Sequence, residues 1–159
     1  MLSESENFFL EKAIELAWSG MKKGEGGPFG AVVVLEGVII GEGNNRVTAT
    51  NDPTAHAEVV AIREACRKLN HYQLTGCHIY TSCEPCPMCL GAIYWARPDR
   101  VIFANTREEA AAIEFDDDFI YREINTGMAQ RRIPFLHVPH PEAQKLFTFW
   151  KNWDQKKMY

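Results

Sequence analysis

The sequence predicts an α/β fold in which a mixed β-sheet carries helices on its faces. Two apolar runs, residues 30–35 and 38–43, flank the pair Glu36-Gly37, which is typical of a β-hairpin with a two-residue turn. Beyond this hairpin, short apolar runs alternate with stretches of helical periodicity, as they do where helices connect the strands of one sheet. A length of 159 residues fits one compact domain, and 46% hydrophobic with 24% charged residues is ordinary for a globular protein.

The helices begin with residues 6–23, where Phe9, Ala13 and Leu16 recur at three- and four-residue steps. Gly24 and the turn residues after it end this helix, and a polar loop is expected over residues 44–53. Pro53, with Asp52 as the N-cap, then starts the second helix. The predicted helices are residues 6–23, 54–69, 86–96, 107–114, 117–124 and 141–157. The predicted strands are residues 30–35, 38–43, 77–82, 100–104 and 134–138.

The charge and the cysteines argue against several classes of protein. The net charge of −4 argues against strong binding to nucleic acid and favours a small neutral substrate. No apolar run approaches the roughly 20 residues that span a bilayer, so we expect no membrane association. The acidic start, Met1–Glu6, lacks the basic region of a secretory signal. We therefore expect a cytoplasmic protein whose five cysteines are reduced thiols or metal ligands, with Cys66 and Cys77 as small core residues.

Cys86 and Cys89 stand three residues apart at the expected start of a helix, within reach of one metal ion. This pair alone fits a redox centre or a structural zinc site. His56 can supply a third ligand, and Cys83 is the remaining candidate for a fourth. Three protein ligands with water in the open position are typical of catalytic zinc, whereas four protein ligands are typical of structural zinc.

Glu58 favours the catalytic alternative. Zinc lowers the pKa of a bound water to about 7, and a carboxylate near the metal can carry the released proton to a leaving group. On an ideal helix, however, residues two apart point about 200° away from each other. His56 and Glu58 can therefore share one site only if the first helical turn departs from that geometry. The pattern His56-x-Glu58 followed by Pro85-Cys86-x-x-Cys89 is the signature of the zinc nucleobase deaminases.

With these residues in place, the chain resembles the cytidine-deaminase-like superfamily, and within it most closely the bacterial guanine deaminases. The likeness covers nearly the whole chain. Its most specific segments are residues 27–31, 51–58, 81–96 and 115–117. The first three are shared in part with tRNA adenosine and cytosine deaminases, whereas Phe115-Asp116-Asp117 and the tyrosine-ended tail point to the guanine branch.

The resemblance implies a three-layer α/β/α fold with a central five-stranded mixed sheet, formed by a single domain of residues 1–159. It implies zinc-dependent hydrolytic deamination of guanine to xanthine and ammonia, a reaction of purine catabolism and salvage. The nearest alternative is a tRNA adenosine, cytosine or guanosine deaminase of the same superfamily. From a different class, a non-catalytic zinc module that binds a partner protein also fits the metal ligands, although it has no use for Glu58.

Carried over by position, the resemblance implies that one Zn²⁺ per subunit is bound by His56, Cys86 and Cys89. It makes Glu58 the proton shuttle, and it makes Asp117 both a contact to the base and a second proton carrier. The substrate would further contact Asn45, the backbone around Ala57, Phe29, Trp95 and Tyr159. Without the resemblance, these residues are ordinary core aromatics, turn and cap residues, and a disordered terminus.

The C-terminal tail, residues 141–159, is expected to be helical and aromatic, with Phe147, Phe149, Trp150 and Trp153. One alternative is that the tail packs on its own subunit and caps the active site. The other is that it covers a second subunit. The resemblance implies a homodimer that acts on a small purine base, and exchange of the tail between subunits is one form that this dimer can take.

Overall fold

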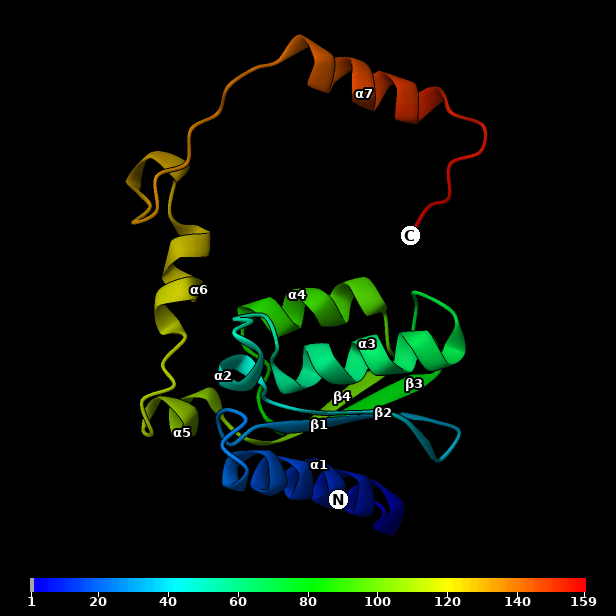
Figure 1. The fold of residues 1–159 in the computed structure, drawn as a ribbon, viewed down its shortest axis with the longest axis vertical. Coiled ribbons are helices and arrows are strands. Elements are labelled where there is room, and N and C mark those ends of the chain that lie inside the picture. The colour runs from blue at the N-terminus through cyan, green and yellow to red at the C-terminus, as the bar shows by residue number, and fades with distance from the viewer. Residues whose placement is uncertain (1) are drawn as a thin grey trace. The chain divides into compact units, whose positions relative to one another are not determined.

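The computed structural model describes residues 2–159, and the chain divides into two compact units. The first unit, Met1–Asp117, contains a sheet with helices on both faces (Figure 1). Its elements are α1 (Glu4–Lys22), β1 (Gly30–Leu35), β2 (Val38–Asn44), α2 (Val47–Thr50), α3 (Ala57–Leu69), β3 (Cys77–Cys83), α4 (Pro87–Ala96), β4 (Arg100–Asn105) and α5 (Arg107–Ala111). The second unit, Asp118–Tyr159, contains α6 (Asp118–Asn125), the 3₁₀ helix η1 (Met128–Gln130) and α7 (Pro141–Asn152).

The predicted hairpin is confirmed. β1 and β2 pair in antiparallel fashion, with Leu35 opposite Val38. Glu36 and Gly37 both have positive φ angles, 49° and 77°, as a two-residue type I′ turn requires. Gly37 meets this requirement without strain because it has no Cβ. The turn therefore sets the register of the first two strands.

The sheet separates two apolar cores. Along β1, alternate residues point to opposite faces of the sheet, so Ala31 and Val33 lie in one core and Val32 and Val34 in the other. The first core is completed by α3 and α4, and the second by Phe9 of α1. Figure 1 shows α1 on one face of the sheet and α3 with α4 on the other. The predicted three-layer α/β/α arrangement is thereby confirmed.

The strand order is β2-β1-β3-β4. β1 is antiparallel to both β2 and β3, whereas β3 is parallel to β4, so the predicted mixed sheet is also confirmed. α4 connects the two parallel strands, and their carboxyl ends therefore meet at one edge of the sheet, where Cys83 pairs with Asn105. That edge leads directly into the cysteine pair on one side and into α5 on the other.

The prediction of a fifth strand over residues 134–138 is wrong, because the sheet in the described part of the chain has four strands. These five residues are exposed and irregular, ahead of α7. Pro134 has no backbone N–H to donate to a ladder, and an apolar run becomes a strand only where a neighbouring edge pairs with it.

Several element boundaries also differ from expectation, and α7 ends at Asn152, before the predicted residue 157. Asp52 does not cap a helix, because its Oδ1 accepts hydrogen bonds from the backbone N–H and hydroxyl of Thr54 at 2.8 and 2.7 Å. α3 consequently begins at Ala57 instead of residue 54. The expected polar loop contains the short helix α2, and α5 ends at Ala111, before the predicted residue 114.

The second unit exposes its apolar residues. Among residues 118–159, all of which the structure describes, none is buried. On α7, Leu146, Phe147 and Phe149 are all more than half exposed. Within residues 2–159, no helix combines the length and the hydropathy that crossing a membrane requires.

Candidate metal and active site

The start of α3 places His56 and Glu58 at one site. His56 is the N-cap of the helix, with an extended backbone (φ −69°, ψ 154°), and Glu58 is the second helical residue. Because His56 stands outside the helix, the separation of about 200° between helical residues two apart does not apply to this pair. The late start of α3, which follows from the Asp52–Thr54 turn, thus removes the geometric difficulty of the sequence pattern.

The cysteine pair occupies the start of α4 in the same way. Cys86 is the N-cap, Pro87 is the first helical residue, and Cys89 lies in the first turn. Proline suits this first position because the N–H that it lacks would have no intrahelical acceptor. The first turn of a helix stabilises negative charge through its backbone N–H groups and dipole. The N-termini of α3 and α4, two helices that pack together, therefore both favour the thiolate form of Cys86 and Cys89.

The ligand atoms fit a zinc ion. Nδ1 of His56 lies 3.5 Å from Sγ of Cys86 and 3.5 Å from Sγ of Cys89. All three atoms lie within 4.8 Å of one another. A tetrahedral ion with Zn–S of about 2.3 Å and Zn–N of about 2.0 Å requires N···S separations of about 3.5 Å. One imidazole and two thiolates are a donor set that zinc favours, so these residues can hold Zn²⁺ without rearrangement.

The protonation of the metal-free ligands is uneven. Hydrogen bonds from Cys89 and His56 lower the pKa of Cys86 to about 4, against the opposing effect of burial. The hydrogen bond with Cys86 and burial raise the pKa of Cys89, and the hydrogen bond with Cys86 raises that of His56. One thiolate is therefore present before a metal binds, and the ion must displace the proton of the other thiol.

Glu58 is a buried carboxyl beside the ligands. Only 6% of the residue is exposed, and its Oε2 lies 3.3 Å from Sγ of Cys89. Burial raises the pKa of Glu58, and the negative charge of Cys86 adds to the effect. A carboxyl with a raised pKa holds its proton more readily and can both accept and return one. The site thus combines a fitted zinc position with an adjacent proton carrier.

Asn45 directly follows β2 and is 5% exposed. Its backbone N–H donates to the Phe29 carbonyl at 3.0 Å, and its Oδ1 accepts from the N–H of Val47 at 3.2 Å. The simpler alternative, a turn residue, is therefore correct. It is also compatible with ligand binding, because the turn occupies the side-chain oxygen and leaves the amide N–H₂ as a donor.

Asp117 lies near the cysteine pair. Burial, followed by the negative charge of Cys86, raises the pKa of Asp117. Ala57, the first residue of α3, is fully buried, and its N–H belongs to the first-turn donors that have no intrahelical acceptor. Ala57 thus adjoins the ligand His56, and Asp117 lies close enough to Cys86 for their charges to interact, while their predicted roles toward a substrate stay predictions.

The three predicted aromatic contacts have different surroundings. Phe29 is half-buried and packs edge-on against Phe115, with ring centroids 4.9 Å apart. Trp95 lies on α4 and is 63% exposed, so it is no core aromatic in this chain. Tyr159 belongs to the second unit and is exposed. A substrate-binding role for these aromatic residues stays a prediction.

Cys83 lies outside the group of metal ligands found among residues 2–159. Its thiol donates to the Thr106 carbonyl at 3.7 Å, and burial raises its pKa to about 11. Reasoning from the sequence missed two further contacts. The Oγ of Ser82 accepts from the Gly30 N–H at 3.0 Å, and Phe115 packs on Phe29. Neither pair has a signal in the sequence, because the partners are joined only by the fold.

The chain is similar to known proteins over most of its length. Residues 3–105 match the family described as the cytidine and deoxycytidylate deaminase zinc-binding region. The chain is 56% identical over 151 residues to a guanine deaminase from Bacillus subtilis strain 168, covering 95% of this chain and 97% of that protein. The X-ray structure of guanine deaminase from Bacillus subtilis matches with a TM-score of 0.95 and 54% identity, covering 99% of both chains. A tRNA-specific adenosine deaminase from Aquifex aeolicus strain VF5 is 36% identical over 143 residues, or 90% of this chain and 91% of that protein.

The stretch that matches the family contains His56, Glu58, Cys86 and Cys89. The residues that form the zinc-binding geometry therefore lie within the stretch that matches the family. The chain belongs to the family defined by the zinc-binding region of the cytidine and deoxycytidylate deaminases.

Proposed function

We propose that the chain is a zinc-dependent guanine deaminase, a hydrolase that converts guanine and water to xanthine and ammonia. The observation that carries this proposal is the 56% identity to a guanine deaminase over 95% of the chain. The likeness to the Aquifex aeolicus tRNA deaminase is lower, at 36%. The predicted cofactor, zinc, fits the ligand geometry of the site.

Glu58 is the proton shuttle in this proposal. Zinc, when bound, supplies a water of lowered pKa for attack on the carbon that bears the amino group. Glu58 would relay both protons of the attacking water, one to the adjacent ring nitrogen and then the other to the amino group that leaves as ammonia. Its burial and its position beside Cys89 support this role. Asp117 is proposed as a contact to the base and as a second proton carrier, supported by its place near Cys86.

The purine base is proposed to bind between the metal and the loops that follow β2. Asn45 donates its amide N–H₂ to an acceptor of the base, because its side-chain oxygen is occupied by Val47. The backbone N–H of Ala57 supplies a second donor at the start of α3. The remaining proposed contacts are the aromatic residues Phe29, Trp95 and Tyr159.

The experiment that tests this function is ammonia release on a panel of guanine, guanosine, cytosine, adenine and tRNA, with zinc measured in the same sample. We expect turnover of guanine and about one zinc per chain. Turnover of another substrate at a higher kcat/KM would contradict the guanine assignment. Full zinc content with no turnover on the whole panel would instead favour a non-catalytic zinc module.

A tRNA adenosine deaminase is the second candidate, and one local feature favours it. A groove of about 590 Å³ beside α2 and α3 is lined by residues that include Arg46, Arg63 and Arg67. Guanidinium groups suit the phosphates of RNA. Asp52, whose carboxylate lies 3.8 Å from Arg63, reduces the positive charge of the groove, and the whole chain carries a net charge of −4. The tRNA arm of the panel therefore decides between the two candidates.

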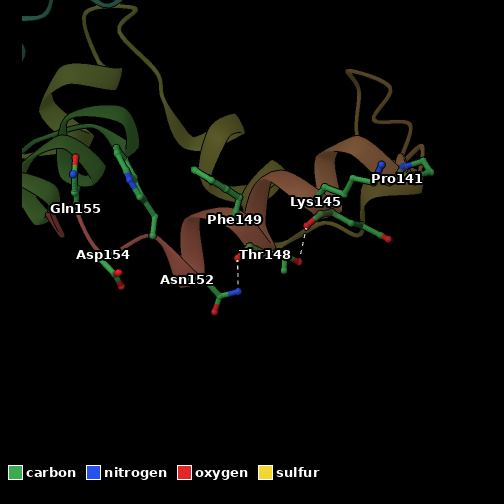
Figure 2. Close-up of a pocket in the computed structure, with 9 residues that line it drawn as sticks. Pro141, Lys145, Thr148, Phe149, Asn152, Asp154 and Gln155 are labelled. Atoms are coloured by element: carbon green, nitrogen blue, oxygen red, sulfur yellow. Dashed lines mark hydrogen bonds between the residues drawn. The ribbon is translucent and has the colours of Figure 1, made fainter.

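The apolar tail supports a proposed homodimer. α7 carries a groove of about 910 Å³ lined in part by Phe149 and Trp153 (Figure 2), and Phe147 is 78% exposed. A surface with this much exposed aromatic area calls for a covering partner. The proposed cover is a second copy of the chain, with residues 141–159 exchanged so that each tail completes the single deaminase domain of the other subunit.

Subunit complementation tests the exchange. A chain with Glu58→Gln keeps a sound tail, and a chain with Tyr159→Ala, which lacks the proposed substrate contact of the tail, keeps a sound proton shuttle. If tails are exchanged, unfolding and refolding the two inactive proteins together restores activity in mixed dimers. An elution volume of a monomer, or no recovery in the mixture, would contradict the exchange.

A cytoplasmic location is proposed on the state of the cysteines. All five are free thiols, and two of them are the proposed zinc ligands. Thiols of this kind persist in a reducing compartment. Cell fractionation followed by detection of the chain tests the location.

A further inference from the structure

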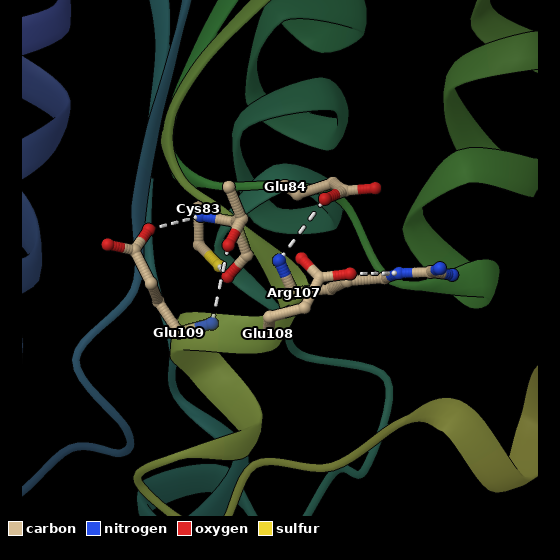
Figure 3. Close-up of polar contacts among 6 residues, drawn as sticks. Cys83, Glu84, Arg107, Glu108 and Glu109 are labelled. Carbon is tan, nitrogen blue, oxygen red and sulfur yellow. Dashed lines mark hydrogen bonds and ion pairs between the residues drawn. The ribbon is translucent and has the colours of Figure 1, made fainter.

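The segment that leads to Asp117 begins with a short helix that is fixed at its first residue. Thr106 and Glu109 form a reciprocal capping box, in which the Thr106 Oγ accepts from the Glu109 N–H at 3.3 Å and Oε2 of Glu109 accepts from the Thr106 N–H at 2.8 Å (Figure 3). α5 has only five residues, and helices of this length are not stable alone in water. The position of α5 therefore depends on its contacts with the rest of the chain.

Those contacts lead to the residues just before the metal ligand Cys86. The Glu84 N–H donates to the Asn105 carbonyl at 2.8 Å, and Oε2 of Glu84 accepts from the Arg107 N–H at 3.1 Å. Figure 3 shows Glu84 facing Arg107, with Cys83 alongside. The start of α5 is thus attached to the end of β3.

The end of α5 turns the chain back. Glu114 has a positive φ of 72°, the Glu114 N–H donates to the Ala111 carbonyl at 3.0 Å, and the Phe115 N–H donates to the Ala110 carbonyl at 3.1 Å. This is the hydrogen-bond pattern of a Schellman motif, which reverses the chain after a helix. Phe115 follows the reversal directly.

Phe115 then meets the loop before β1. Its ring packs edge-on against Phe29, with centroids 4.9 Å apart and planes at 90°. Gly27 makes this fit possible, because a Cβ there would lie 2.8 Å from Cζ of Phe115 and 3.0 Å from Cε2 of Phe29. The loop is itself held in place, since the Phe29 N–H donates to the Gly27 carbonyl at 2.8 Å.

We propose that Phe115 is a positioning residue, whose ring, wedged between Phe29 and the bare backbone of Gly27, holds Asp117 against the metal site. The chain from Phe115 to Asp117 is only two residues long, so a fixed ring restricts where the carboxyl can lie. The pKa of Asp117, raised by burial and by Cys86, agrees with a carboxyl held close to the ligands. The inference rests on the proposed role of Asp117 in guanine deamination.

Phe29 also forms a backbone hydrogen bond with Asn45, which Phe115 does not. The Phe29 carbonyl accepts from the Asn45 N–H at 3.0 Å, so changes at Phe29 disturb both Asn45 and Asp117. Phe115 makes its backbone hydrogen bond to Ala110, and none joins it to Asn45 in the described part of the chain. Truncation of Phe115 therefore leaves the Phe29–Asn45 hydrogen bond in place, and it is the variant of choice.

We expect Phe115→Ala to lower kcat for guanine about tenfold to a hundredfold, the effect of a displaced catalytic group, with zinc content unchanged. Phe115→Met, which keeps an apolar side chain of similar volume, should restore most of the rate. Phe8→Ala is the matched control. Phe8 is 49% exposed against 46% for Phe115, and it also packs edge-on against a phenylalanine, Phe9, at 5.4 Å, but it lies on α1. This control should lose some thermal stability and keep its kcat.

A double-mutant cycle separates positioning from a merely structural role. In the Asp117→Asn background, Phe115→Ala should cause almost no further loss of kcat, whereas the losses of thermal stability should add. Gly27→Ala should lower kcat by pushing the Phe115 ring outward, and its effect should be smaller in the Phe115→Ala background, where only the contact with Phe29 remains. A crystal structure of Phe115→Ala should show the Asp117 carboxyl displaced.

The outcomes distinguish the inference from the function on which it rests. If Asp117→Asn keeps the full kcat, the proposed role of Asp117 fails, and the positioning role fails with it. If Asp117→Asn lowers kcat but Phe115→Ala does not, only the positioning role is overturned. Multiplicative losses of kcat in the double mutant would likewise overturn it.

Discussion

Replacement of Glu58 by glutamine gives the sharpest test of the site. Glutamine has the shape of glutamate and keeps an amide oxygen where the carboxylate oxygen lies, 3.3 Å from the Cys89 sulfur. It cannot carry a proton in the way that a carboxylate does. The substitution therefore removes the chemistry of Glu58 while it keeps the packing around the zinc ligands.

The expected loss follows from the burial of Glu58. General acid–base catalysis by one side chain contributes about 10²- to 10⁴-fold, which corresponds to about 2.7–5.4 kcal/mol of activation free energy. Only 6% of Glu58 is exposed, so bulk water has little access to replace it as a proton carrier. We therefore expect the upper half of this range, about 10³- to 10⁴-fold in kcat.

The assay is ammonia release from guanine under saturating conditions, with zinc measured by atomic absorption on the same preparation. Glu64→Gln is the matched control. Glu64 lies on the same helix, is exposed, and uses Oε2 to accept the Glu42 N–H at 2.9 Å. The same chemical change at this position should leave kcat and zinc content unchanged.

A Glu58→Gln variant that binds zinc normally and keeps a kcat within a few-fold of the native value would refute the proton-shuttle role. Loss of zinc together with activity would show that Glu58 supports the metal ligands and would leave its proton-transfer role without support. An equal loss in Glu64→Gln would place the effect in the fold of α3.

Three further outcomes are expected. After zinc removal, iodoacetamide at pH 6 should label Cys86 first, because its pKa is lowered to about 4. Mass spectra should show Cys83 unlabelled, because its pKa is raised to about 11. Equal labelling of both cysteines would contradict this. In the metal-free protein, burial raises the pKa of Glu58 above its ordinary 4.5, so the contribution of Glu58 to the free energy of unfolding should fall as pH rises above 4.5, whereas that of Cys86, whose pKa is lowered to about 4, should rise. The difference between urea titrations of the native protein and of Glu58→Gln should show the falling contribution of Glu58. Phe9→Ala should cost about 3–5 kcal/mol of stability, since Phe9 is 7% exposed and packs on Tyr80, and thermal melts that leave the native Tm unchanged would oppose this.

The residues that carry the chemistry could be found in the sequence because their signals are local. Cys86 and Cys89 are spaced for one helical turn, and Pro87 marks the start of that helix. The pair Glu36-Gly37 indicates a turn by itself, since few residues tolerate a positive φ. The apolar run in β1 is continuous because both faces of that strand are buried. In each case the physical cause lies within a few residues of the feature.

The tertiary structure decided those features of the fold that depend on contacts with residues distant in the sequence. Residues 134–138 have the composition of a strand, yet no sheet edge pairs with them and Pro134 lacks a donor. The position of Glu58 beside His56 depends on α3 starting at Ala57, which the Asp52–Thr54 turn settles against the local signal of Pro53.

The sequence by itself determined the zinc ligands and the order of the longer helices and the four strands, because motif spacing and hydrophobic periodicity are properties of neighbouring residues. Only the tertiary structure decided that Phe115 packs over Gly27 and that Asp117 lies near Cys86. These contacts join residues far apart in the chain, and their free energies exist only once β3, β4 and α5 are assembled.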